Sequence, residues 1–198
     1  IVVPTPAHFA VAKEAVARGK HVLIEKPLTA TLAEADELLD IASRNGALVQ
    51  TGHVERFNRA IRAAMPYVDR PRFLESDRLA PFNPRGSDVA VVLDLMIHDI
   101  DFALAVVGEA PSRIDAIGVA VLTESEDLAN ARLEFPSGAV ASLTASRVSP
   151  EKLRKIRVFA EHGYRTAFAT DCSRFNYQDA SSGFDWRERI LRGSRRRQ

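Results

Sequence analysis

Lys26 is the first residue whose type and position could support chemistry. It directly follows a strand-like run, His21–Ile24, and Pro27 breaks that run because proline cannot extend a central strand. In an open parallel α/β sheet, ligands bind outside the carboxyl ends of the strands. Lys26 would therefore present an ammonium group to a ligand. The alternative is a surface lysine in a polar loop, and three residues alone do not decide between the two.

A second group of reactive side chains lies in the apolar segment 91–107. Asp94, His98 and Asp101 follow one another at offsets of four and three, which places them on one face of a helix, with Asp99 off that line. Buried carboxylates and imidazoles are costly unless they are paired. We interpret His98 as a general acid or base and Asp94 as the residue that orients it or binds substrate. A structural His–Asp pair remains the alternative, and without a second cluster of metal-ligand spacing we expect no metal.

The elements that would position Lys26 occupy residues 1–55. Strand-like runs alternate with helical patterns, and the short connections imply parallel strands with right-handed crossovers. The expected elements are strands at 1–3, 21–24 and 48–50, and helices at 5–18 and 31–44. Thr5 is the expected N-cap of the first helix, and Thr31 with Glu34 forms a capping box before the second.

A β-rich region follows the apolar helix. Alternating residues at 129–135, a turn at 136–138 and a return over 139–146 predict a hairpin, and 155–160 predicts a further strand. The predicted fold class is α/β: a partial Rossmann, doubly wound parallel sheet over 1–55, then an α+β domain with a mostly antiparallel sheet over 56–163. Residues 164–198 show no clear period and are predicted to be a poorly matched, disordered tail.

Composition limits the class of partner. The formal net charge is +1 and no apolar run is long enough to span a bilayer, so we expect neither a nucleic-acid-binding nor a membrane protein. Cys172 is the only cysteine, which excludes an internal disulfide and fits a reducing compartment. An arginine cluster at 187–197 could bind phosphate backbones, but such runs are more often solvated tails.

The first residue, Ile1, lies inside an apolar run, and the sequence holds no G-x-G-x-x-G segment. We therefore expect a chain that lacks its natural N-terminus and binds a dinucleotide poorly or not at all.

The order of these motifs resembles the Gfo/Idh/MocA family of NAD(P)-dependent oxidoreductases over about residues 1–163. The resemblance rests on VPTPAH at 3–8, GKHVLIEKP at 19–27 and DLMIHDID at 94–101. It implies a Rossmann domain, a second domain with a large sheet that often mediates oligomer formation, a cytoplasmic location, and NAD or NADP as cofactor. It also implies that Lys26 hydrogen-bonds the reacting hydroxyl beside the nicotinamide, His98 is the acid/base and Asp94 supports it.

The same resemblance implies that Thr5, His8, Glu25 and Lys26 line the cofactor site. GHVERFN at 52–58 and ASRVS at 145–149, followed by RKIR at 154–157, further resemble the branch that oxidises the 3-hydroxyl of UDP-N-acetylglucosamine for lipid A or other envelope sugars. Arg56 and Arg147 are the candidate ligands of the diphosphate, because the guanidinium fork binds phosphate bidentately, although surface arginines are common. The alternative function is a non-catalytic sugar-phosphate binding or regulatory protein of the same fold.

Overall fold

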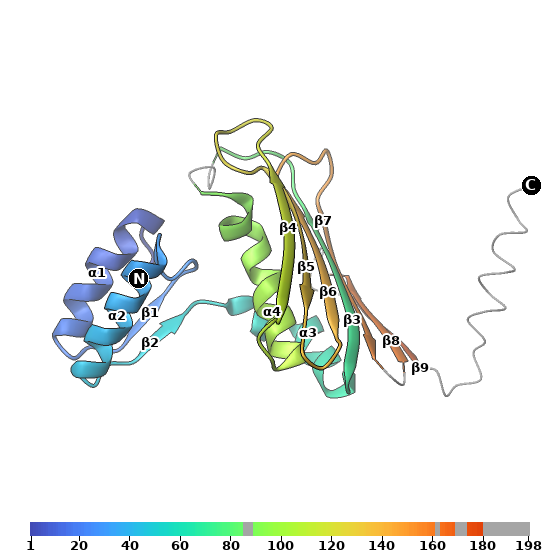
Figure 1. Cartoon of the computed structure of the whole chain (residues 1–198), viewed down its shortest axis with the longest axis horizontal. Coiled ribbons are helices and arrows are strands. Elements are labelled where there is room, and N and C mark those ends of the chain that lie inside the picture. Colours follow the sequence, from blue (N-terminus) through green and yellow to red (C-terminus); the bar gives the residue numbers. More distant parts are fainter. Residues whose placement is uncertain (85–88, 161–162, 169–173, 180–198) are drawn as a thin grey trace, which may run out of the picture.

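The computed structural model describes residues 1–84, 89–160, 163–168 and 174–179. Two units follow one another along the chain: an α/β unit, and a larger sheet that carries one long helix (Figure 1). Within the described ranges, no helix has both the length and the apolar character needed to cross a membrane. The arginine cluster at 187–197 lies outside the described residues.

The first unit has the predicted alternation of helix and strand. Its elements are α1 (Thr5–Ala17), β1 (Val22–Ile24), α2 (Leu32–Arg44) and β2 (Val49–Thr51). The two strands are parallel, with Val22 opposite Val49. The capping box of α2 is confirmed, since the Thr31 hydroxyl accepts from the Glu34 N–H and the Glu34 carboxylate accepts from the Thr31 N–H. Gly19 ends α1 with φ +68°, a left-handed conformation that favours glycine.

Two expectations for the start of the chain are wrong. Residues 1–3 do not form a strand, although the Ile1 carbonyl accepts from the Glu25 N–H and so lies beside the end of β1. This contact between Ile1 and Glu25 is too short to form a β-strand pairing. Thr5 is not the N-cap of α1: Pro4 takes that position, there is no side-chain capping bond, and Thr5 is the first helical residue.

The second unit begins with short helices and continues into a seven-stranded sheet. The helical elements are η1 (Val54–Phe57), α3 (Arg59–Ala64), η2 (Met65–Tyr67), the π-helical turn η3 (Val92–Met96) and α4 (Ile97–Val107). The strands are β3 (Pro71–Leu79), β4 (Arg113–Val119), β5 (Leu128–Glu134), β6 (Val140–Ser146), β7 (Leu153–Ala160), β8 (Gly163–Phe168) and β9 (Arg174–Asp179). Their order is β4-β5-β6-β3-β7-β8-β9.

The predicted hairpin is confirmed as β5 and β6, which pair antiparallel. The central strand β3 was not predicted from the sequence. It runs parallel to β6 and antiparallel to β7, so the sheet is mixed but mostly antiparallel. Leu74, Ser76 and Arg78 are its buried residues, and a core face with two polar side chains lacks the apolar alternation that indicates a strand.

Helix α4 packs on one face of this sheet (Figure 1). Met96, Phe102 and Ala103 from η3 and α4 share one buried cluster with Leu74 of β3 and Leu143 of β6. This packing fixes the polar residues of the helix relative to β3.

The predicted domain limit at residue 163 is too early. Strands β8 and β9 extend the sheet beyond β7, with Lys155 opposite Phe168 and Gly163 opposite Asp179. The predicted disordered tail is therefore wrong for 164–168 and 174–179. The rest of 164–198 lies outside the described residues.

Candidate active site

Lys26 and Asp94, 68 residues apart in sequence, are in contact. The Lys26 Nζ donates to the Asp94 carbonyl oxygen at 2.6 Å and lies 3.1 Å from Asp94 Oδ1. An ammonium group has three N–H donors, so these two acceptors leave one donor for a ligand. The Lys26 side chain is 20% exposed, which leaves it accessible at the junction of the two units.

The local structure explains how Lys26 reaches this position. Strand β1 ends at Ile24, and the Lys26–Pro27 peptide bond is cis. The buried ring of His8 lies between two backbone carbonyls, with Nδ1 2.8 Å from Pro27 O and Nε2 2.8 Å from Val3 O. His8 therefore ties the start of α1 to the turn that carries Lys26. Both ring nitrogens face backbone carbonyls, and the predicted contact between His8 and a cofactor stays a prediction.

Glu25 lies between the end of β1 and Lys26, and Thr5 is the first residue of α1. A Cβ on Gly52, just after β2, would stand 3.2 Å from Glu25 Oε2, so a larger residue would crowd that carboxylate. Glycine at 52 thus lets the Glu25 carboxylate lie against the end of β2. The carboxyl ends of the strands are where ligands bind in parallel sheets, and the predicted cofactor contacts of Thr5 and Glu25 stay predictions.

Each acidic residue on the helix is held by a cation from another element. Asp94, in the π-helical turn, forms an ion pair with Lys26. Asp99 receives two bonds from Arg78 of β3, with Nε–Oδ2 2.8 Å and Nη2–Oδ1 2.9 Å. Asp101 receives two bonds from Arg56 of η1, at 2.7 and 2.6 Å.

His98 is the polar residue of the helix that remains unpaired. Neither of its ring nitrogens has a hydrogen bond to any described residue, and Nδ1 is buried. Burial lowers the pKa of His98 to about 4, and the positive charges of Arg78, Lys26 and Arg154 contribute, while Glu55 opposes them. The ring is therefore neutral at pH 7 and able to accept a proton.

A shell of charged side chains that was not predicted from the sequence acts on His98. Glu55 lies 3.0 Å from Arg154 Nη1 and 3.6 Å from Arg78 Nη1. Burial would raise the pKa of Glu55, but the two guanidiniums lower it below its ordinary value. The acid-rich helix and the RKIR segment at 154–157 were the signals in the sequence that could have indicated this shell. The residues around Arg78 in β3 give no sign that its side chain is buried.

Arg56 is the first of the two predicted phosphate ligands. Its guanidinium is bound to Asp101, while 52% of its side chain is exposed. The hydrogen bonds to Asp101 raise the pKa of Arg56 above its ordinary value. Arg56 could therefore bind a phosphate only while its guanidinium also binds Asp101.

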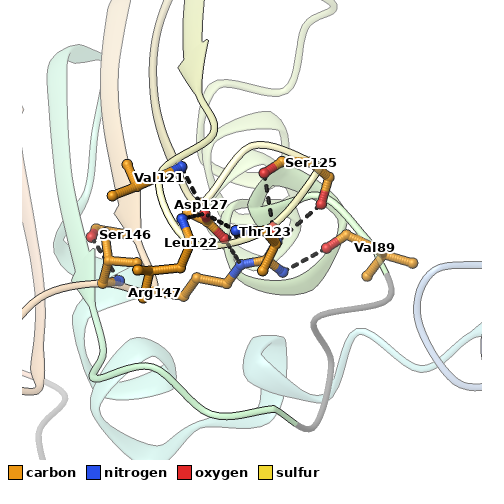
Figure 2. Close-up of polar contacts among 9 residues, drawn as sticks. Val89, Val121, Leu122, Thr123, Ser125, Asp127, Ser146 and Arg147 are labelled. Carbon is orange, nitrogen blue, oxygen red and sulfur yellow. Dashed lines mark hydrogen bonds and ion pairs between the residues drawn. The ribbon is translucent and has the colours of Figure 1, made fainter.

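Arg147, the second predicted ligand, has its guanidinium bound within the protein, and its predicted contact with a diphosphate stays a prediction. Its guanidinium is buried and donates to Asp127 Oδ1 (2.7 Å), Val89 O (2.6 Å), Thr123 Oγ1 (2.9 Å) and Ser125 Oγ (3.0 Å), as Figure 2 shows. Burial would raise the pKa of Asp127, but three backbone N–H groups from 121–123 and Arg147 hold it far below its ordinary value. Arg147 therefore anchors the loop between β4 and β5.

The described residues contain no group of three or more His, Cys, Asp or Glu side chains that could hold a metal ion. The Lys26 ammonium lies near enough to the neutral His98 imidazole to help lower the pKa of that ring.

Residues 1–53 match the oxidoreductase family with an NAD-binding Rossmann fold, and residues 59–165 match the Gfo/Idh/MocA C-terminal domain. The UDP-N-acetylglucosamine 3-dehydrogenase of Acidithiobacillus ferrooxidans is 44% identical over 165 residues, which cover 83% of this chain and 53% of that protein. A solved structure of that enzyme matches with a TM-score of 0.82 at 40% identity, covering 90% of this chain and 62% of the other.

Other relatives are named for different substrates. The myo-inositol 2-dehydrogenase of Thermotoga maritima is 30% identical over 161 residues, covering 73% of this chain and 48% of that protein. Levoglucosan dehydrogenase, solved with NADH and levoglucosan, shares the fold with a TM-score of 0.85 at 20% identity, covering 94% of this chain and 58% of that chain. The chain spans about half the length of the curated relatives it matches. Because both family models match in order and together cover most of the described residues, the chain belongs to the Gfo/Idh/MocA family of oxidoreductases.

Proposed function

We propose that this chain carries the hydroxyl-oxidising site of a nicotinamide-dependent sugar dehydrogenase. The observation that supports it is the contact of Lys26 with Asp94, which brings an ammonium with one remaining donor to the helix that carries the neutral His98. The substrate we propose is UDP-N-acetylglucosamine, oxidised at its 3-hydroxyl, because the UDP-N-acetylglucosamine 3-dehydrogenase of Acidithiobacillus ferrooxidans is 44% identical to this chain.

The residues of this chain divide the chemistry between them. The free N–H of Lys26 donates to the sugar oxygen and stabilises negative charge as the proton leaves. His98 accepts that proton, since its ring is neutral at pH 7. Asp94 holds Lys26 in place. Thr5 and Glu25 line the nicotinamide side, and His8 acts by holding the turn at Pro27. Bound NAD or NADP would supply the carbon that takes the hydride.

The test is reduction of NAD or NADP by the full-length gene product, followed by nicotinamide absorbance, with a panel of UDP-sugars and free inositols. We expect reduction with UDP-N-acetylglucosamine, and a loss of about a hundredfold or more in kcat for Lys26→Met and for His98→Gln. Lys20→Met is the matched control, because Lys20 is exposed and outside the site. Unchanged turnover in both site variants would contradict the assignment. Binding of UDP-sugars without any reduction would favour the non-catalytic alternative.

We also propose that the chain self-associates through the sheet face opposite α4. The register places Ile117, Val119 and Leu128 on that face, and all three are exposed. Exposed neighbouring apolar side chains on a sheet face favour association. We expect sedimentation to show an oligomer that Ile117→Lys weakens, and a monomeric parent chain would contradict this.

A further inference from the structure

Glu55 lies where three elements of the second unit meet. It belongs to η1, and its Oε1 is 3.0 Å from Arg154 of β7 and 3.6 Å from Arg78 of β3. Each aspartate of the helical segment pairs with one lysine or arginine, whereas Glu55 lies beside two arginines. Its side chain is 19% exposed, so solvent screens these contacts only in part.

The two guanidiniums are held beside the helix. Arg78 is fixed by its two bonds to Asp99, the residue next to His98, and its side chain is 6% exposed. Among the described residues, the carboxylate that Arg154 contacts is that of Glu55. Loss of Glu55 would leave Arg154 without its anchor and would leave the buried Nη1 of Arg78 without a nearby anion.

The charges of Glu55 and of the nearby cations shift the pKa of His98. The cations come from three elements: Lys26 after β1, Arg78 of β3 and Arg154 of β7. On its own helical segment, Asp94 and Asp99 are already bound by Lys26 and Arg78. Glu55, from η1, raises the pKa of His98, whereas those cations lower it.

We propose that Glu55 is a positioning residue for His98: it holds Arg154 and Arg78 in place and supplies the negative charge that offsets them at the ring. Without this charge the ring would face three cations and would accept a proton less readily. The catalytic meaning of this role rests on the proposed function, whereas the effect on the ring does not.

The test is the titration of the His98 imidazole, followed by ¹⁵N–¹H NMR of the whole chain. Arg154→Gln removes one cation and should raise the titration midpoint, which moves it away from acid unfolding. Adding Glu55→Gln in that background should lower the midpoint by about 0.5 pH unit or more. Glu55→Asp keeps the charge and should leave the midpoint close to that of Arg154→Gln.

Glu37→Gln in the same background is the matched control, because Glu37 is also ion-paired, to Lys13 at 2.6 Å, but lies in α2. It should leave His98 unchanged. An equal midpoint with and without Glu55→Gln, or a fall with Glu55→Asp as large as with Glu55→Gln, would overturn the inference. The titration needs neither substrate nor cofactor, so it can fail while the turnover tests of Lys26 and His98 succeed, and the reverse.

Discussion

Replacing Arg78 by methionine gives the sharpest test of how the site is built. Arg78 and Asp99 form a two-bond ion pair at 2.8 and 2.9 Å, with side chains 6% and 2% exposed. Methionine keeps much of the apolar stem but removes the charge. The carboxylate of Asp99 would then be buried without a cation.

The expected cost follows from this burial. Removing one member of a buried ion pair destabilises a protein by about 3–5 kcal/mol, because the remaining charge is uncompensated. An exposed pair contributes about 1 kcal/mol or less. Since a domain is stable by about 5–15 kcal/mol, Arg78→Met should remove about a fifth or more of the free energy of unfolding.

The assay is urea denaturation at neutral pH, followed by circular dichroism. Arg113→Met is the matched control, because Arg113 pairs with Asp115 at 2.9 Å with both side chains more than half exposed. We expect a large fall in the urea midpoint for Arg78→Met and a small one for Arg113→Met. The double variant Arg78→Met/Asp99→Leu should recover most of the loss, since apolar replacement of a whole buried pair is often neutral or stabilising.

Two results would refute this reasoning. A loss for Arg78→Met no larger than that for Arg113→Met would mean that burial does not set the cost. A double variant as unstable as Arg78→Met would mean that packing around the arginine stem, rather than the stranded carboxylate, dominates.

Three further predictions concern His98, α2 and the β4–β5 loop. The folded pKa of His98, about 4, lies below the ordinary 6.5, so its contribution to stability is present above pH 6.5 and is lost as the pH falls toward 4. His98→Gln should reduce that loss in thermal melts compared across this range. Thr31→Ala removes the capping box and should cost about 1 kcal/mol in urea denaturation, whereas Thr31→Ser should not. Arg147→Lys keeps the charge but cannot reproduce the four donor contacts, so its melting temperature should fall, and an unchanged value would show that the network is dispensable.

Much of the first unit could be predicted because its signals are local. The capping box of Thr31 and Glu34 and the left-handed Gly19 depend on residues within one or two turns. The β5–β6 hairpin likewise depends on alternation and a short turn. Local rules failed for β3, whose buried face carries a serine and an arginine, and for Ile1, whose neighbours along the sheet edge are too few to form a ladder.

The residue types at the site were visible in the sequence, because Lys26 follows a strand and Asp94 and His98 share a helical face. Which charges meet was decided only by tertiary structure. Arg147 and Arg56 looked alike as phosphate ligands, but one is buried against Asp127 and the other is half exposed beside Asp101. An arginine has the same charge in both places, and what differs is burial and the partner that packing brings from 20 or 45 residues away. Helix spacing could place carboxylates on a face, but only the packing of that helix on the sheet determined which cation binds each of them. The same packing left the buried Nδ1 of His98 without a hydrogen-bond partner among the described residues.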